Sequence, residues 1–221
     1  MPGMTIKKAI LASILWCGIF FPSADAAAQI TPTPSQTRPH QSAAVLAVPH
    51  IRQEKDLCVP TSAAMVLSFF GETRSPRELK ALSRGRHYDP ALPFDDFSST
   101  WFKDMVSGMR LIGYNWSEGY FSNDAAGFEA GLAAIEVQLG RRNPVLVDTS
   151  FSKSEGHTFV VAGIDRETAQ LHIVDPDMRA PGLRIMTFKA FEAVWNSTAV
   201  GTNKRGAIFT SRRDPTTAGT R

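Results

Sequence analysis

The chain carries the stretch Gln53-Glu-Lys-Asp-Leu-Cys58-Val-Pro-Thr-Ser-Ala-Ala-Met-Val-Leu67. Pro60 suits the first turn of a helix, because its missing N–H would be unpaired there, and the apolar residues that follow predict a helix as far as Phe70. Cys58 then lies at the start of this helix, where unpaired backbone N–H groups favour an anion. The stretch therefore predicts a helix that presents a reactive thiolate. A small buried cysteine is the alternative.

The first 28 residues have the pattern of a signal peptide. Lys7 and Lys8 precede an apolar run over residues 9–21, and the alanines of residues 24–28 suit a cleavage site. The apolar run is shorter than the about 20 residues needed to span a bilayer. Removal of the leader would discard Cys17 and leave Cys58 as the single cysteine of an exported protein, which marks it as a candidate reactive group. We expect a periplasmic or secreted protein with no stable membrane association after leader removal.

The remaining sequence predicts one domain between a linker and a tail. Residues 29–45 are rich in Thr, Pro, Ser, Gln and Ala and predict a flexible linker, and residues 212–221 predict a disordered tail. In the domain, residues 46–211, helical patterns cover residues 60–70, 76–83, 96–111 and 124–139. They are followed by strand patterns over residues 144–148, 157–164, 171–174, 183–188 and 206–211, with a short helix over 190–195. Helices followed by strands favour an α+β fold.

Two further side chains complete a chemical pattern with the thiol. His157 opens one strand pattern, and Asp175 directly follows the next, across a polar turn over residues 165–170. Folding this hairpin about Arg166 places the two side chains directly opposite each other on one face, and a register slip of two would leave them diagonal neighbours. Thiol, imidazole and carboxylate in this order suggest a nucleophile, its base and the group that orients the base. A buried histidine held by a carboxylate is the alternative.

Gln53 lies five residues before Cys58. Its side-chain amide and the backbone N–H of Cys58 would form a pair of donors to a developing oxyanion. A solvated polar residue in a loop is the alternative.

Composition and motifs exclude several classes of site. The formal net charge of +3 is small and scattered, so no nucleic-acid partner is expected. The sequence has no CxxC pair and no HExxH, so neither a metal site nor another cofactor is expected. An aromatic-rich stretch over residues 94–121 predicts core packing, with a wall of a substrate cleft as the alternative.

The motifs also resemble a known family. Val48-Pro-His-Ile-Arg-Gln53 with Cys58 and Ala63–Leu67, then Gly156-His157, then Asp175-Pro176 resemble, in this order, three motifs of papain-like cysteine peptidases of the C39-like, bacteriocin-processing group. The resemblance covers about residues 46–211. It implies a papain-like fold whose N-terminal helical half carries the cysteine and whose C-terminal antiparallel sheet carries the histidine and the aspartate.

The resemblance implies a role for each of the four residues. Cys58 would be the nucleophile, His157 the base, Asp175 the orienting residue and Gln53 the oxyanion donor. The chain departs from the family pattern at Val59, where members usually have glycine.

Three functions remain open from the sequence. The first is an exported cysteine peptidase that cleaves a peptide or protein substrate through a thioester acyl-enzyme. A thiol acyltransferase or amidase, γ-glutamyl or transamidating, would use the same triad with an amine in place of water as the acceptor. The third is a non-catalytic papain-like binding module, since a fold alone does not imply a reaction. The sequence does not indicate an oligomeric state.

Overall fold

The computed structural model describes residues 45–152, 155–197 and 203–213. The predicted signal peptide, almost all of the predicted linker and most of the predicted tail lie outside these residues. The helices are α1 (Cys58–Phe69), α2 (Pro76–Ser83), α3 (Phe102–Leu111), α4 (Ala125–Gly140) and α5 (Phe188–Val194). The strands are β1 (Ser117–Phe121), β2 (Val145–Ser150), β3 (Gly156–Asp165), β4 (Gln170–Val174), β5 (Leu183–Thr187) and β6 (Arg205–Phe209).

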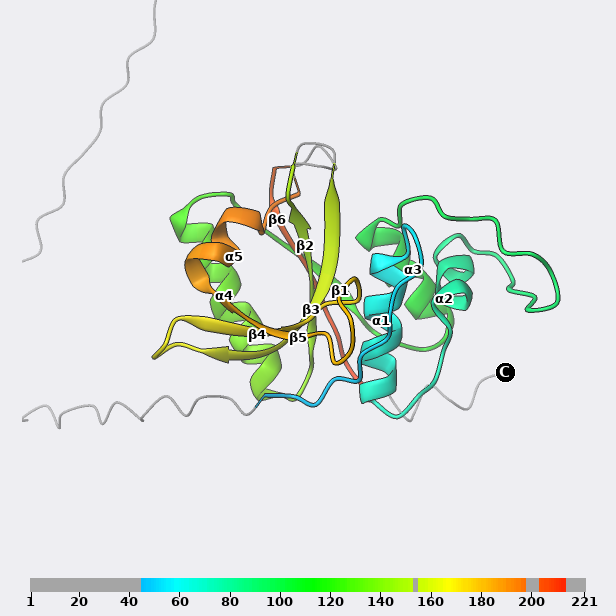
Figure 1. The fold of residues 1–221 in the computed structure, drawn as a ribbon, viewed down its shortest axis with the longest axis horizontal. Coiled ribbons are helices and arrows are strands. Elements are labelled where there is room, and N and C mark those ends of the chain that lie inside the picture. The colour runs from blue at the N-terminus through cyan, green and yellow to red at the C-terminus, as the bar shows by residue number, and fades with distance from the viewer. Residues whose placement is uncertain (1–44, 153–154, 198–202, 214–221) are drawn as a thin grey trace, which may run out of the picture. The chain divides into compact units, whose positions relative to one another are not determined.

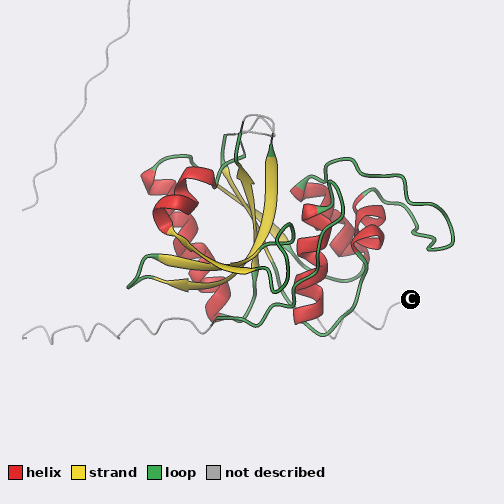
Figure 2. Cartoon of the chain, viewed as in Figure 1, coloured by secondary structure: helices red, strands yellow, loops and turns green. Residues whose placement is uncertain are grey.

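The six strands form one antiparallel sheet in the order β1-β6-β2-β3-β4-β5. Figure 1 shows α1, α2 and α3 on one side of this sheet and α4 and α5 on the other. Helices dominate the first part of the described chain and strands the second, as Figure 2 shows by colour. The prediction of an α+β fold is confirmed.

Helix α1 lies between the sheet and the other two N-terminal helices. Its residues Val59–Leu67 are all buried, so the helix has no solvated face over this length. Its packing on β3 includes a polar contact, because the Ser62 hydroxyl donates a hydrogen bond to the backbone oxygen of Thr158 at 3.2 Å. This contact fixes the start of α1 against the start of β3.

Local capping explains why α2 begins where the sequence predicted. The Ser75 hydroxyl accepts a hydrogen bond from the backbone N–H of Glu78 at 3.1 Å, and Pro76 occupies the first turn, where it needs no donor. The predicted start of this helix at residue 76 is therefore confirmed.

Two sequence predictions about this region are wrong. The third helix begins at Phe102 instead of Asp96, because the polar groups of residues 96–100 bond to Lys80, Arg84 and Arg86 rather than to a helical backbone. Strand β1, residues 117–121, was not predicted at all. Its sequence Ser-Glu-Gly-Tyr-Phe lacks a β-branched residue, and it becomes a strand by pairing with β6.

Candidate active site

Cys58 is the first residue of α1 and is half-buried. Leu57, at the N-cap, supplies no side-chain hydrogen bond to the helix, and the first turn holds no acidic residue. The positive end of the helix dipole is therefore not neutralised locally, and an anion at the Cys58 sulfur would be stabilised there.

His157 and Asp175 are in direct contact. Nε2 of His157 lies 2.7 Å from Oδ1 of Asp175, and both side chains are largely buried. His157 is the second residue of β3, and Asp175 directly follows β4.

The predicted register of this hairpin is wrong. Val160 pairs with Val174, so Asp175 continues the strand opposite Phe159 rather than opposite His157. The register shifts between Val161 and Gly163, where β3 carries a bulge beside the glycine. His157 and Asp175 meet as diagonal neighbours, which the length of the imidazole side chain allows.

The other side of the imidazole faces the thiol. The Cys58 side chain is hydrogen-bonded to His157, and since Nε2 is engaged by Asp175, Nδ1 is the ring nitrogen free for the sulfur. Burial lowers the pKa of His157, but the hydrogen bonds and charges of Asp175 and Cys58 outweigh burial and raise the pKa to about 9. The arrangement favours an imidazolium at neutral pH, with the Cys58 sulfur beside it.

Asp175 is itself held in the charged state. Burial disfavours its carboxylate, but the His157 hydrogen bond, the backbone N–H of Asp177 at 3.0 Å and the Arg184 guanidinium together keep its pKa below the ordinary value. Arg184 Nη2, from β5, lies 3.3 Å from Oδ2, the oxygen that His157 does not use. The carboxylate therefore has a cation on each side.

The segment before α1 is attached to the same aspartate. The backbone N–H of Gln53 donates to the oxygen of Pro176 at 2.9 Å, and Nε2 of His50 lies 3.2 Å from the backbone oxygen of Asp175. Gly182 leaves room for the His50 ring, which any side chain at this position would overlap. These contacts bring the Gln53 segment beside the histidine and the aspartate.

The Gln53 side chain has an uncommitted group. Its Oε1 atom is buried and makes no hydrogen bond within the described residues. Gln53 is not among the residues that line the hollow at the thiol. His157 thus lies between Cys58 and Asp175, and the Gln53 segment is bonded to the residue that follows Asp175.

The thiol and the imidazole open on a hollow of about 750 Å³, a volume that includes space open to solvent. The hollow lies between α1, the segment before α3, the second half of β2 and the start of β3. It is lined by Asp56, Cys58, Val59, Ser99, Thr100, Asp148, Glu155, Gly156, His157 and Thr158. Val59 is buried at its edge, at the position where the family resemblance led us to expect glycine.

Comparison with known proteins agrees with this geometry. A sequence profile of the Peptidase_C39 like family matches residues 45–202. The chain belongs to the peptidase C39-like family. No curated protein sequence matches it significantly.

A solved structure of another protein shares the papain-like fold of this C39-like chain, and a second one matches it less well. The peptidase domain of Streptococcus ComA, a bifunctional ABC transporter involved in a quorum-sensing pathway, superimposes with a TM-score of 0.52 at 20% identity, over 75% of this chain and 99% of that chain. A double-glycine-motif protease from an AMS/PCAT transporter, solved with its leader peptide, gives a TM-score of 0.47 at 17% identity, over 78% of this chain and 96% of that chain. The predicted fold, with the cysteine on the helical half and histidine and aspartate on the sheet, is confirmed.

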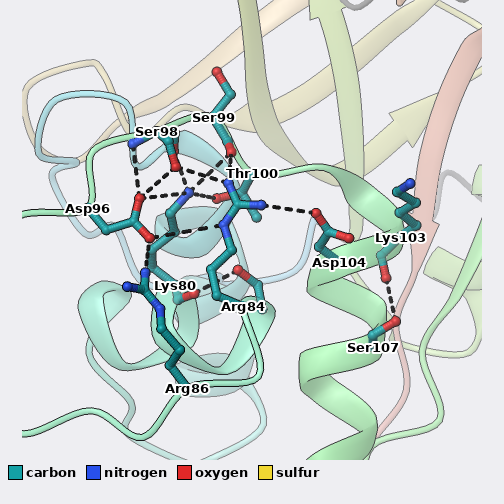
Figure 3. Close-up of polar contacts among 11 residues, drawn as sticks. Lys80, Arg84, Arg86, Asp96, Ser98, Ser99, Thr100, Lys103, Asp104 and Ser107 are labelled. Atoms are coloured by element: carbon teal, nitrogen blue, oxygen red, sulfur yellow. Dashed lines mark hydrogen bonds and ion pairs between the residues drawn. The ribbon is translucent and has the colours of Figure 1, made fainter.

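A buried lysine fixes one wall of the hollow in this C39-like domain. Lys80, fully buried on α2, donates to the backbone oxygens of Ser98 and Ser99 and to Oγ1 of Thr100 (Figure 3). Arg84 adds a second hydrogen bond to the Ser99 oxygen at 2.7 Å. The segment that carries Ser99 and Thr100 is therefore anchored from behind, away from the thiol.

Sequence reasoning missed three residues that shape this site: His50, Asp148 and Arg184. His50 belongs to the same sequence motif as Gln53, but the sequence names no partner for its ring. Asp148 ends the apolar run Pro144-Val-Leu-Val, and a charge at the end of a buried strand is a signal that was available. Arg184 gave no signal, because its contact depends on the β4–β5 register.

Within the described residues, no group of three or more His, Cys, Asp or Glu side chains could hold a metal ion. The same part of the chain contains no helix with the length and hydropathy of a membrane span.

Proposed function

We propose that this chain is a cysteine peptidase that cleaves a peptide bond through Cys58, His157 and Asp175. The observation that carries the proposal is the imidazole of His157, held by Asp175 on one nitrogen and hydrogen-bonded to Cys58. Membership of the C39-like family supports the reaction class.

In the proposed first step, the Cys58 thiolate attacks the carbonyl carbon of the scissile bond. The negative charge moves to the carbonyl oxygen, where the backbone N–H of Cys58 and the amide of Gln53 donate hydrogen bonds. As the C–N bond breaks, His157 gives its proton to the leaving amine. The product of this step is a thioester between Cys58 and the acyl half of the substrate, together with a free amine.

In the second step, His157 takes a proton from water, and the resulting hydroxide attacks the thioester. The C–S bond breaks, the acyl half leaves as a carboxylic acid, and Cys58 returns to the thiolate paired with the imidazolium. Asp175 takes no part in bond changes. It holds the imidazole in the orientation that points one nitrogen at the sulfur.

The test is cleavage of a peptide library by the purified protein, with Cys58→Ala as the matched control. We expect cleavage products from the first protein only. A thioester on Cys58 that persists in water, and that reacts with an added amine to give a new amide, would instead favour the acyltransferase or amidase reaction. Mass spectrometry detects both products. A library left intact by wild-type protein, with peptides still bound, would favour the binding module and overturn the proposal.

We further propose that the chain is exported and acts outside the cytoplasm. The leader pattern of residues 1–28 supports this, although these residues lie outside the described part of the chain. N-terminal sequencing of the exported protein should begin between Ala27 and Gln29. An intact Met1 on membrane-bound protein would contradict the proposal.

A further inference from the structure

Asp148 stands where two hollows meet. It lines the hollow at Cys58 and His157, and it also lines a second hollow of about 370 Å³, open to solvent, whose walls include Trp101 and Tyr120. Val59 and Thr100 line both hollows as well. The two hollows therefore adjoin at these three residues, with the thiol on one side and the two aromatic rings on the other.

The sheet explains how these groups come to share a face. Across the sheet, Tyr120 of β1 pairs with Gly206 of β6, Gly206 pairs with Asp148 of β2, and Asp148 pairs with Thr158 of β3. Directly paired residues point to the same side of a sheet. A side chain at position 206 would contact both Asp148 and Tyr120, so glycine keeps the space between them open.

The lining of the two hollows is unbalanced in charge. Asp148, Asp56 and Glu155 contribute carboxylates, no lysine or arginine lines either hollow, and His157 is the single basic group. Burial raises the pKa of Asp148 to about 6, against the opposing effects of the Ser197 hydroxyl and His157, so most of the group is still ionised at pH 7. Within the described residues no arginine or lysine forms an ion pair with this carboxylate, and His157 is the basic group that acts on it.

The aromatic walls suit the stem of a long cationic side chain. Trp101 and Tyr120 are 44% and 48% exposed, although large aromatic residues of a folded domain are more often covered. Aromatic faces attract ammonium and guanidinium groups and pack against alkyl chains. A carboxylate at the inner end of an aromatic passage is the arrangement that a lysine or arginine side chain would fill.

We infer that Asp148, with Trp101 and Tyr120, forms a subsite for a lysine or arginine side chain of the substrate, next to the bond that is cut. The inference rests on the proposed function for the identity of that bond. It commits to a side chain rather than a free peptide N-terminus, because an α-ammonium has no alkyl stem to occupy the aromatic passage.

The test uses pairs of peptides that differ at one residue beside the cleavage site, with Lys or Arg in one and Gln or Met in the other. All peptides are prepared with free and with acetylated N-termini. Wild-type protein should show a higher kcat/KM for the cationic member of each pair, with or without acetylation. A preference that disappears on acetylation would assign the site to an N-terminal ammonium and overturn the inference.

Asp148→Asn removes the charge without changing the size of the side chain. We expect this variant to lose about 10- to 100-fold in kcat/KM on the cationic peptides and to change little on the neutral ones. Glu167→Gln, in the turn between β3 and β4, is the matched control. It changes the net charge by the same amount, but at a position far from the cleft. An equal loss on both kinds of peptide, or no loss on the cationic ones, would overturn the inference.

A binding measurement separates this inference from the proposed function. In the Cys58→Ala background, Asp148→Asn should weaken the affinity for cationic peptides and leave the affinity for neutral ones unchanged. If wild-type protein cuts no peptide but this difference appears, the subsite stands and the peptidase proposal fails. If wild-type protein cuts peptides without regard to charge, the peptidase proposal stands and the subsite fails.

Discussion

Two buried charges lie on opposite sides of the cleft and have different surroundings. On the helical side, the Lys80 ammonium has three donors and three nearby acceptors, from Ser98, Ser99 and Thr100, and its side chain is fully buried. On the sheet side, the His157 imidazole is paired with Asp175 but keeps 13% of its side chain exposed and opens on the hollow with Cys58.

This difference separates a structural charge from a chemical one. Both groups are desolvated, and both are hydrogen-bonded, so burial and pairing alone would not distinguish them. What distinguishes them is whether the charged group still has a hydrogen-bonding atom available to a substrate. All three N–H donors of Lys80 are already used, so none is left for a substrate. His157, in contrast, faces the Cys58 thiol and the hollow in which a substrate would bind. Substitutions on the two sides should therefore have different consequences, for stability on one side and for turnover on the other.

The largest effect should come from Cys58→Ala. We expect turnover to disappear, because no other group can form the thioester, while the free energy of unfolding changes by less than about 1 kcal/mol since the residue is small and half-buried. Peptide cleavage and urea unfolding of the same preparation check both parts. Full turnover by Cys58→Ala would remove the chemical role from this side of the cleft.

Gln53→Ala should reduce kcat by about 10²–10³ if its amide stabilises the oxyanion. Its neighbour Arg52, which is exposed, provides the control Arg52→Ala. Steady-state kinetics with a library-derived peptide and matched circular dichroism spectra are the measurements. Unchanged kcat in the Gln53 variant would show that the Gln53 amide N–H has no part in the reaction.

Lys80→Met should act on stability. The substitution leaves the oxygens around residues 98–100 without their donor, and an unsatisfied buried acceptor costs about 1–3 kcal/mol. Lys103→Met, on the exposed side of α3, is the control and should change stability by less than about 0.5 kcal/mol. Denaturant midpoints give the comparison. A loss of kcat in Lys80→Met with unchanged stability would mean that Lys80, like His157, acts on the reaction rather than on the stability of the fold.

Arg184→Gln should shift a pH profile with little effect on the maximum rate. Removing the guanidinium raises the pKa of Asp175, so the acid limb of kcat/KM should move to higher pH by up to about one unit. Arg179→Gln, nearby in sequence and exposed, should leave the limb in place. An unmoved limb in Arg184→Gln would show that this ion pair does not act on the aspartate.

The smallest effect should be a difference in how stability depends on pH. The pKa of His157 is raised to about 9 in the folded state from about 6.5 in an unfolded chain, so its contribution is complete below pH 6.5 and is lost as pH rises through 9. Burial and Arg84 instead lower the pKa of Lys80, so that its contribution grows as the pH rises toward the ordinary lysine value.

The free energy of unfolding of the wild-type protein should therefore be lower at pH 9 than at pH 6.5. In His157→Gln the difference between the two pH values should be smaller. Equal slopes in the two proteins would show that the imidazole is not held in its charged form by the fold.

Much of the fold was predictable because its signals are local. Pro60, the Ser75 cap and the apolar runs of the central strands each act within a few residues, and the structure places the corresponding helices and strands within a few residues of the predicted bounds. The contact between His157 and Asp175 was also predictable, because a hairpin allows only a few registers and two of them bring the side chains together.

The parts that could not be predicted depend on distant pairing. β1 is a strand because β6, about 90 residues later, pairs with it, and Gly119 leaves room for the Phe209 ring. The bulge in β3 lies beside Gly163, a residue type that often marks a bulge, but a glycine does not show by how much the register shifts. Arg184 reaches Asp175 only through the pairing of β4 with β5, and Asp148 meets the aromatic wall only across β6.

The position of β6 has a consequence for the order in which the molecule is assembled. This strand is the last element of the described chain, yet it lies inside the sheet, between β1 and β2. During synthesis, β1 therefore has no neighbour until residues 205–209 have been made and inserted. The thiol, the imidazole and the carboxylate precede this strand in the chain, but the wall beyond Asp148 is completed only by its arrival. A chain cut short before Arg205 would carry Cys58, His157 and Asp175 and still lack the strand that joins β1 to β2.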